Sequence, residues 1–124
     1  MAIAIAPESA ERFAQEWVAA WNSGDLERIL SHYCDDFEMR SPLIAERGFS
    51  EDGRLRGKAA IRPYWKAGLA AVPPIRFELI GVHSGIGAIA ICYRSIGRGK
   101  VVVERIELDE SGRGLRAEAL YRDE

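Results

Sequence analysis

The sequence contains few of the residues that mark a metal centre, a cofactor site or a disulfide framework. Cys34 and Cys92 are its only cysteines, and neither they nor the two histidines have the spacing of zinc ligands. The glycines form no dinucleotide-binding or phosphate-binding loop between a strand and a helix. We therefore expect no cofactor and no metal, and we expect the two cysteines to be buried thiols rather than a disulfide.

An excess of charge of one sign is also missing. The formal net charge is −2, and the 17 lysines and arginines are spread along the chain. A nucleic-acid site or an anionic membrane surface would need these cations in a cluster, so we expect neither partner. No apolar run approaches the roughly 20 residues that span a bilayer, and residues 1–6 lack the charged start of a signal peptide. The sequence therefore predicts a cytoplasmic protein.

The composition that remains is that of an ordinary globular protein. Of the 124 residues, 48% are hydrophobic and 29% are charged. A chain of this length and composition buries enough apolar surface for one core. We therefore predict a single domain over residues 1–124.

Three helices are predicted in the N-terminal half of the chain. Phe13, Trp17 and Trp21 recur every four residues, which places them on one apolar face of a helix. A second, short helix has apolar residues that include Leu30 and Tyr33 on one face. Proline, glycine and capping residues mark where these helices begin and end. These signals are Pro7, Ser23-Gly24, Asp25, Gly57 and the pair Pro73-Pro74.

Five strands complete the predicted secondary structure. Residues 35–42 alternate, with Phe37, Met39 and Ser41 on one face, and residues 43–56 are predicted to be a polar loop. The other strands are expected at 75–83, 87–96, 100–109 and 114–122. The short turns between them predict consecutive antiparallel hairpins. Three helices on the concave side of a strongly curved antiparallel sheet make an α+β fold.

The later strands are apolar on both faces. The segments 88–93 and 101–103 are apolar at nearly every position, instead of alternating with polar residues. Both faces of such strands should be covered, one by the helices and the other by a second subunit. We therefore predict a homodimer through the outer face of the sheet.

Glu104 is the residue whose position is most unusual. Within the strand it shares a face with Val102, Ile106 and Leu108, and this face should point inward. A carboxylate among apolar residues is costly unless it is hydrogen-bonded or protonated, so its pKa should be raised, which makes it a catalytic acid/base candidate. The alternative is a structural glutamate paired with an arginine. Candidate partners are Arg40, Arg62 and Arg94.

Four segments together resemble a known family. They are Trp-Asn-Ser-Gly-Asp at 21–25, Asp-Asp-Phe at 35–37, Leu-Arg-Gly-Lys-Ala-Ala-Ile at 55–61 and Glu-Leu-Asp-Glu-Ser-Gly-Arg at 107–113. Their order and spacing resemble the nuclear transport factor 2-like superfamily, which includes ketosteroid isomerase and the SnoaL-like cyclases. The resemblance runs from about Glu8 to Tyr121 and implies a cone-shaped fold with a small-molecule pocket.

Carrying the isomerase site over by position gives a mixed result. The aspartate that moves the proton falls on Ser41, whose hydroxyl is not a base near neutral pH without an activating partner. The oxyanion-hole tyrosine falls on Trp17, and the protonated oxyanion-hole aspartate falls on Glu104. The standard steroid isomerisation is therefore disfavoured. The expected ligand-binding residues are Trp17, Tyr33, Met39, Ser41, Trp65 and Tyr121.

Two hypotheses of function stay open, and the sequence does not decide whether the protein is an enzyme. The first is an isomerase- or lyase-like enzyme that acts on a small, mostly apolar carbonyl or polycyclic compound, with Glu104 as acid or base. The second is a non-catalytic ligand-binding or dimerisation module. A cavity of roughly 300 Å³ or more that touches Glu104 would favour the first. A filled cone with an ion-paired Glu104 would favour the second.

Overall fold

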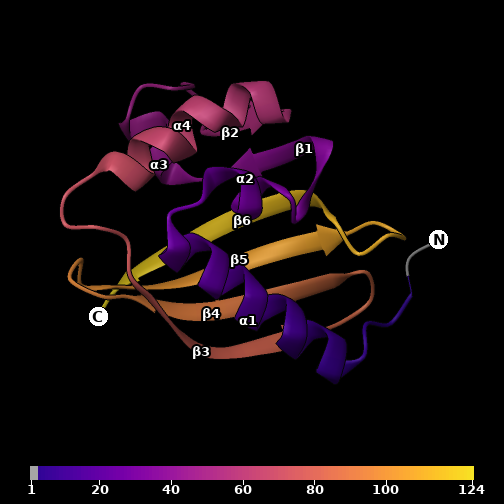
Figure 1. The fold of residues 1–124 in the computed structure, drawn as a ribbon. Helices are drawn as coiled ribbons and strands as arrows, with labels where there is room; N and C mark the ends of the chain where they lie inside the picture. The colour runs from indigo at the N-terminus through magenta and orange to yellow at the C-terminus, as the bar shows by residue number, and fades with distance from the viewer. Residues whose placement is uncertain (1–2) are drawn as a thin grey trace.

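The computed structural model describes residues 3–124, which form four helices and six strands (Figure 1). The elements in chain order are α1 (Pro7–Ser23), α2 (Leu26–Leu30), β1 (Tyr33–Arg40), α3 (Pro42–Glu46), β2 (Arg54–Arg56), α4 (Lys58–Ala70), β3 (Phe77–Ser84), β4 (Ala88–Ser95), β5 (Lys100–Leu108) and β6 (Gly114–Asp123). The first two residues of the apolar 1–6 segment lie outside the described part of the chain.

The six strands form one curved, unclosed sheet in the order β2-β1-β6-β5-β4-β3. Strands β3 to β6 pair as consecutive antiparallel hairpins, as the short turns predict. The pair of β1 and β6 is parallel, so the sheet is mostly rather than wholly antiparallel. This pairing joins segments that lie far apart in the sequence, a contact that no local turn signal predicts. Figure 1 shows all four helices, which belong to the N-terminal half, against the sheet.

The segment 43–56 is not the loop that its polar composition predicts. The hydroxyl of Ser41 accepts a hydrogen bond from the backbone N–H of Leu43 (3.2 Å), and Pro42 takes the first position of α3. Serine at the N-cap followed by proline is a strong helix start, although this helix has only five residues. Strand β2 then pairs with β1 at the edge of the sheet. Tyr33 is likewise not helical, because α2 ends at Leu30 and Tyr33 begins β1.

The motif at 21–25 has a structural role at each of four positions. Gly24 has φ 73°, and its N–H donates to the carbonyl of Trp21, which ends α1. The carboxylate of Asp25 then caps α2. The Asn22 side chain donates to the carbonyl of Phe77 (2.9 Å) and accepts from its N–H (2.7 Å). The motif therefore ties the end of α1 to the start of β3.

The core is aromatic and lies between the helices and the concave side of the sheet. Trp17, Tyr33 and Phe37 are fully buried, and the rings of Tyr33 and Phe37 stack with centroids 4.3 Å apart. A side chain on Gly114 would place its Cβ only 2.6 Å from the Tyr33 ring, so β6 can approach β1 this closely only with glycine there. Cys34 and Cys92 are free thiols, and both are half-buried rather than buried.

Candidate functional site

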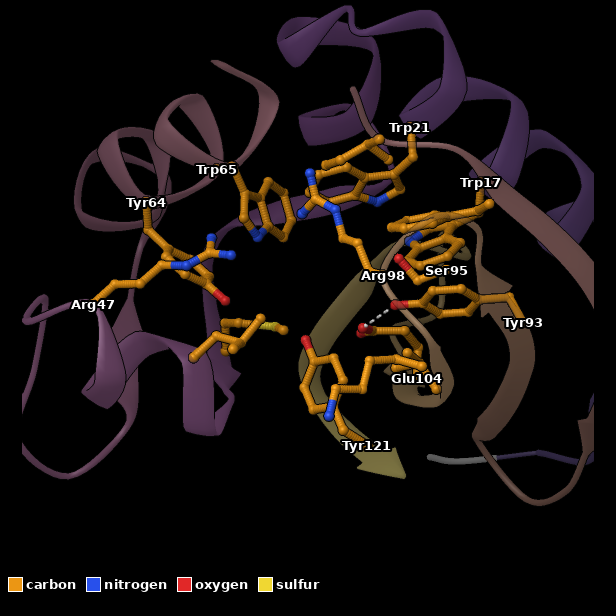
Figure 2. Close-up of a pocket in the computed structure, with 17 residues that line it drawn as sticks. Trp17, Trp21, Arg47, Tyr64, Trp65, Tyr93, Ser95, Arg98, Glu104 and Tyr121 are labelled. Atoms are coloured by element: carbon orange, nitrogen blue, oxygen red, sulfur yellow. Dashed lines mark hydrogen bonds between the residues drawn. The ribbon is translucent and has the colours of Figure 1, made fainter. Parts of the chain in front are cut away.

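A cavity of about 220 Å³ opens between the helices and the concave side of the sheet. Glu104 on β5 contributes the carboxyl group, and seven of the 17 lining residues are aromatic (Figure 2). The aromatic side chains come from α1, α4, β3, β4 and β6, and they include Trp21, Tyr64, Trp65, Phe77, Tyr93 and Tyr121. The volume equals that of about seven liquid waters at roughly 30 Å³ each, and it is below the roughly 300 Å³ from which ligand pockets usually start.

The alternation of β5 places Glu104 at this cavity. Val102, Glu104 and Ile106 point to the concave side and are buried, and Glu104 is only 4% exposed. Glu104 lies directly across from Ile91 in the β4–β5 pair, and Tyr93 stands two residues along the same face of β4. Diagonal neighbours across a sheet are within reach of a long aromatic side chain. Tyr93 is therefore positioned to meet the carboxyl group.

The Glu104 carboxyl accepts a hydrogen bond of 3.0 Å from the hydroxyl of Tyr93 (Figure 2). Burial raises the pKa of Glu104 from 4.5 to about 7, and the hydrogen bond from Tyr93 only partly opposes this shift. No cation within residues 3–124 forms an ion pair with it. The carboxyl group is consequently poised to bind or release a proton near neutral pH.

The arginines that the sequence offers as partners of Glu104 are engaged elsewhere. Arg40 pairs with Glu118, Arg62 pairs with Glu27, and Arg94 pairs with both Glu78 and Glu124. These ion pairs are partly exposed and lie away from the cavity lining. The structure therefore does not contain the ion pair on which the structural interpretation of Glu104 depends.

The tyrosines near Glu104 are held in the protonated form. Burial is the main cause that raises the pKa of Tyr33, Tyr64, Tyr93 and Tyr121, and the negative charge of Glu104 raises each of them further. Contact with the Ser41 side chain lowers the pKa of Tyr64 and Tyr121, but by less than burial raises it. At neutral pH these hydroxyls are therefore hydrogen-bond donors and not bases.

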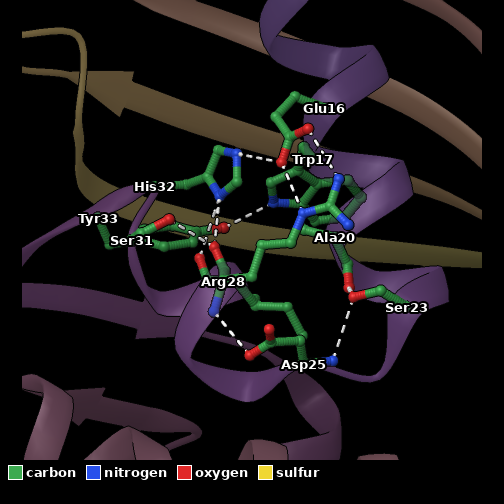
Figure 3. A network of polar contacts seen from close by, with 10 residues as sticks. Glu16, Trp17, Ala20, Ser23, Asp25, Arg28, Ser31, His32 and Tyr33 are labelled. Carbon is green, nitrogen blue, oxygen red and sulfur yellow. Dashed lines mark hydrogen bonds and ion pairs between the residues drawn. The ribbon is translucent and has the colours of Figure 1, made fainter.

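The cavity brings together most of the residues that the sequence suggests as ligand-binding. Trp17, Met39, Trp65 and Tyr121 all line it with Glu104. Two do not. Tyr33 lies behind Trp17, whose indole N–H donates to the Tyr33 hydroxyl over 2.8 Å (Figure 3), and Ser41 caps α3 and lines a shallow hollow beside β1.

His32 belongs to a separate polar network at the junction of α1 and α2 (Figure 3). Its Nδ1 lies 3.0 Å from the carbonyl oxygen of Arg28, and its Nε2 lies 3.7 Å from a carboxylate oxygen of Glu16. The Arg28 guanidinium also pairs with Glu16 at 2.8 Å. This network holds the two helices together, and His32 does not line the cavity.

Three cationic side chains and one indole at the cavity were not found by sequence reasoning. Arg47, Arg98 and Lys100 contribute to its lining, and Lys100 is paired with Asp123. The indole N–H of Trp21 is buried and has no hydrogen-bond partner among residues 3–124. Tyr93 was missed as well, although the sequence contains a signal for it. Counting outward from the turn at 97–98 along the predicted hairpin places Tyr93 near Glu104.

Neither a cluster of metal ligands nor a helix that could span a membrane occurs in the described residues. Within residues 3–124 no three His, Cys, Asp or Glu side chains gather as metal ligands would. In the same range no helix is long and apolar enough to cross a bilayer.

Comparisons with known proteins identify the family and the fold. The family model for the SnoaL-like domain matches residues 14–120. A SnoaL-like protein of unknown function from Burkholderia thailandensis E264 is 39% identical, with a TM-score of 0.91 over 96% of this chain and 98% of that chain. An NTF-2 like protein of unknown function from Burkholderia xenovorans LB400 is 16% identical, with a TM-score of 0.74 over 94% of this chain and 85% of that chain. No curated protein matches the chain.

Proposed function

The chain belongs to the SnoaL-like domain family, and from that premise we propose that it binds a small, mostly apolar carbonyl compound and moves a proton on it through Glu104. The observation that carries the proposal is a buried carboxyl group that lines the cavity, has no cationic partner among residues 3–124, and has a pKa raised to about 7. A group with this pKa serves as base and as acid near neutral pH.

The proposed chemistry is an isomerisation that needs one proton-transfer group. The Glu104 carboxylate takes a proton from the carbon next to the carbonyl, and the resulting carboxylic acid returns it to another carbon of the same molecule. The Tyr121 hydroxyl, which lines the same cavity and stays protonated, donates a hydrogen bond to the carbonyl oxygen as negative charge develops on it. Tyr93 positions Glu104 through its hydrogen bond.

Exchange of α-hydrogens tests this chemistry without knowledge of the natural substrate. The bicyclic ketone 1-tetralone in D₂O, followed by proton NMR, reports proton removal from the carbon next to its carbonyl. We expect the wild-type protein to accelerate exchange and Glu104→Gln to lose on the order of 100-fold or more of that acceleration. Glu107→Gln, a matched change on the outer side of the same strand, should keep it. Equal exchange with wild type and Glu104→Gln would contradict the proposal.

The second candidate is a non-catalytic ligand-binding module. It is favoured by the cavity volume of about 220 Å³, which is small for a polycyclic substrate, and by Ser41 at the position of the isomerases' aspartate. This candidate predicts that 1-tetralone binds to the wild-type protein and to Glu104→Gln with equal affinity and without exchange. Calorimetry combined with the NMR assay separates the two candidates.

A homodimer through the outer face of the sheet remains part of the proposal. Cys92, Val103 and Leu120 stand side by side in register on that face, and Leu120 is 50% exposed. Covering this apolar row would stabilise a dimer. Sedimentation should show a dimer at micromolar concentration and a monomer for Leu120→Lys, whereas a wild-type monomer would contradict the proposal.

A further inference from the structure

We infer that the molecule bound in the cavity carries a carboxylate, which Arg98 and Arg47 bind while its apolar body lies against the tryptophans. This inference rests on the proposed function, because it concerns the ligand of the same cavity. It adds a requirement for the charge of that ligand. Three observations, on two guanidiniums and one indole, carry it.

Arg98 comes from the turn between β4 and β5 and reaches the segment that follows α4. One of its terminal nitrogens donates to the carbonyl oxygen of Pro73 over 2.5 Å. The side chain is half-buried, and within residues 3–124 no carboxylate forms an ion pair with it. Figure 2 shows its guanidinium among the side chains that line the cavity, near Trp21 and Trp65. Its remaining N–H groups are available for a ligand.

Arg47 follows α3 and reaches the same cavity from another part of the chain. Its guanidinium carbon lies 5.9 Å from the centre of the Tyr64 ring. One of its terminal nitrogens lies 3.5 Å from the place of a Cβ at Gly68, so the guanidinium packs against α4. The residue is exposed, and no carboxylate of residues 3–124 pairs with its positive charge.

Trp21 supplies a third donor without a partner. Its side chain lines the cavity and the residue is only 8% exposed, yet its indole N–H makes no hydrogen bond within the described part of the chain. A buried donor that stays unpaired costs on the order of 1–3 kcal/mol, and a ligand acceptor would remove this cost. The indole therefore supports the inference together with the two arginines.

The balance of charges favours an anion over a cation or a neutral ligand. The two guanidiniums of Arg47 and Arg98 and the indole N–H of Trp21 share the cavity lining with a single carboxyl group, Glu104, which is mostly neutral below pH 7. A guanidinium presents two parallel N–H groups whose spacing matches the two oxygens of a carboxylate. The apolar wall then accommodates the rest of a small organic acid.

Matched pairs of acids and amides test the charge requirement directly. Benzoate with benzamide, and 2-naphthoate with 2-naphthamide, differ in charge but hardly in shape. Calorimetric titrations at about pH 6, where Glu104 is mostly protonated, should show the acid of at least one pair binding about tenfold or more tightly than its amide. In Arg47→Met/Arg98→Met the two affinities should become equal. Arg12→Met, a change of an exposed arginine outside the cavity, should keep the preference.

Each other outcome overturns the inference. The inference fails if no acid binds, if acids and amides bind equally to the wild-type protein, or if the preference survives the double substitution. The acid–amide comparison needs no turnover, so its failure is distinct from failure of the proposed chemistry. A preference for acids without exchange of 1-tetralone would keep this inference and remove the chemistry. Exchange of 1-tetralone together with equal binding of acids and amides would keep the proposed chemistry and remove this inference.

Discussion

On the outer face of the sheet Glu107 lies between the guanidiniums of Arg105 and Arg116, whereas Glu104, three residues earlier on the same strand, pairs with no cation of the described residues. The two arginines lower the pKa of Glu107, and burial raises the pKa of Glu104 to about 7. One strand therefore holds a carboxylate that is charged at neutral pH and a carboxyl group that is close to half-protonated. The difference arises from which face each side chain occupies, and not from the residue type.

Glu104→Gln, which removes the titrating group, should change the free energy of unfolding more than the other substitutions proposed here. In the unfolded chain the carboxyl titrates near 4.5, so between this pH and about 7 the folded protein keeps a proton that the unfolded chain has lost. The neutral group stabilises the fold fully below pH 4.5, and this stabilisation is lost as the pH rises through about 7. Glu104→Gln stays neutral, so at pH 8 it should be more stable than wild type by about 3 kcal/mol.

Chemical denaturation at two pH values measures this difference. The two proteins should have the same free energy of unfolding near pH 4, and the gap should open only above the unfolded pKa. A Glu104→Gln variant that is less stable than wild type at both pH values would show that the carboxylate has a charged partner. Glu104 would then be an ion-paired carboxylate like Glu107.

Tyr93→Phe should have the next largest effect. The substitution removes the hydrogen bond that Glu104 accepts and leaves a buried oxygen without it, at a cost of about 1–3 kcal/mol in the free energy of unfolding. Because this bond lowers the pKa of Glu104, its loss should move that pKa further upward. Tyr121→Phe removes a hydroxyl from the same cavity and is the control. A lower pKa in Tyr93→Phe would contradict the assignment of the hydrogen bond.

Glu107→Gln should have the smallest effect, because its ion pairs lie at the surface. Its partners Arg105 and Arg116 are largely exposed, so solvent screens both interactions. We expect a loss below about 1 kcal/mol at low salt, which becomes smaller as salt is added. A larger, salt-independent loss would contradict the exposure of these two ion pairs.

The sequence predicts those parts of the fold that local signals determine. Gly24 and Asp25 mark the junction of α1 and α2, and alternation along β5 places Glu104 on the inner face. The short turns predict the hairpins from β3 to β6. The parallel pair of β1 with β6 joins distant segments, and no local pattern reveals it.

The candidate site was predicted less completely than the fold, because its members depend on side-chain direction and on long-range packing. Strand alternation pointed to Glu104, and the resemblance to the family pointed to Trp17 and Tyr121. All three line the cavity. Ser41 was not recognised as the cap of a five-residue helix, since so short a helix leaves no periodicity to detect. Arg98 lies in a turn whose glycines indicate only a change of direction, and nothing local shows that its side chain turns inward.

A direct measurement of the Glu104 pKa would decide whether this buried carboxyl group can exchange a proton near neutral pH. Carbon-13 NMR of the side-chain carboxyl, assigned by comparison with Glu104→Gln and followed from acidic to alkaline pH, gives the value without any ligand. We expect a pKa of about 7 for Glu104 and a value below the ordinary 4.5 for Glu107 in the same spectra. A Glu104 pKa at or below 4.5 would contradict a neutral buried carboxyl group, because the group would then be charged and stabilised by a partner.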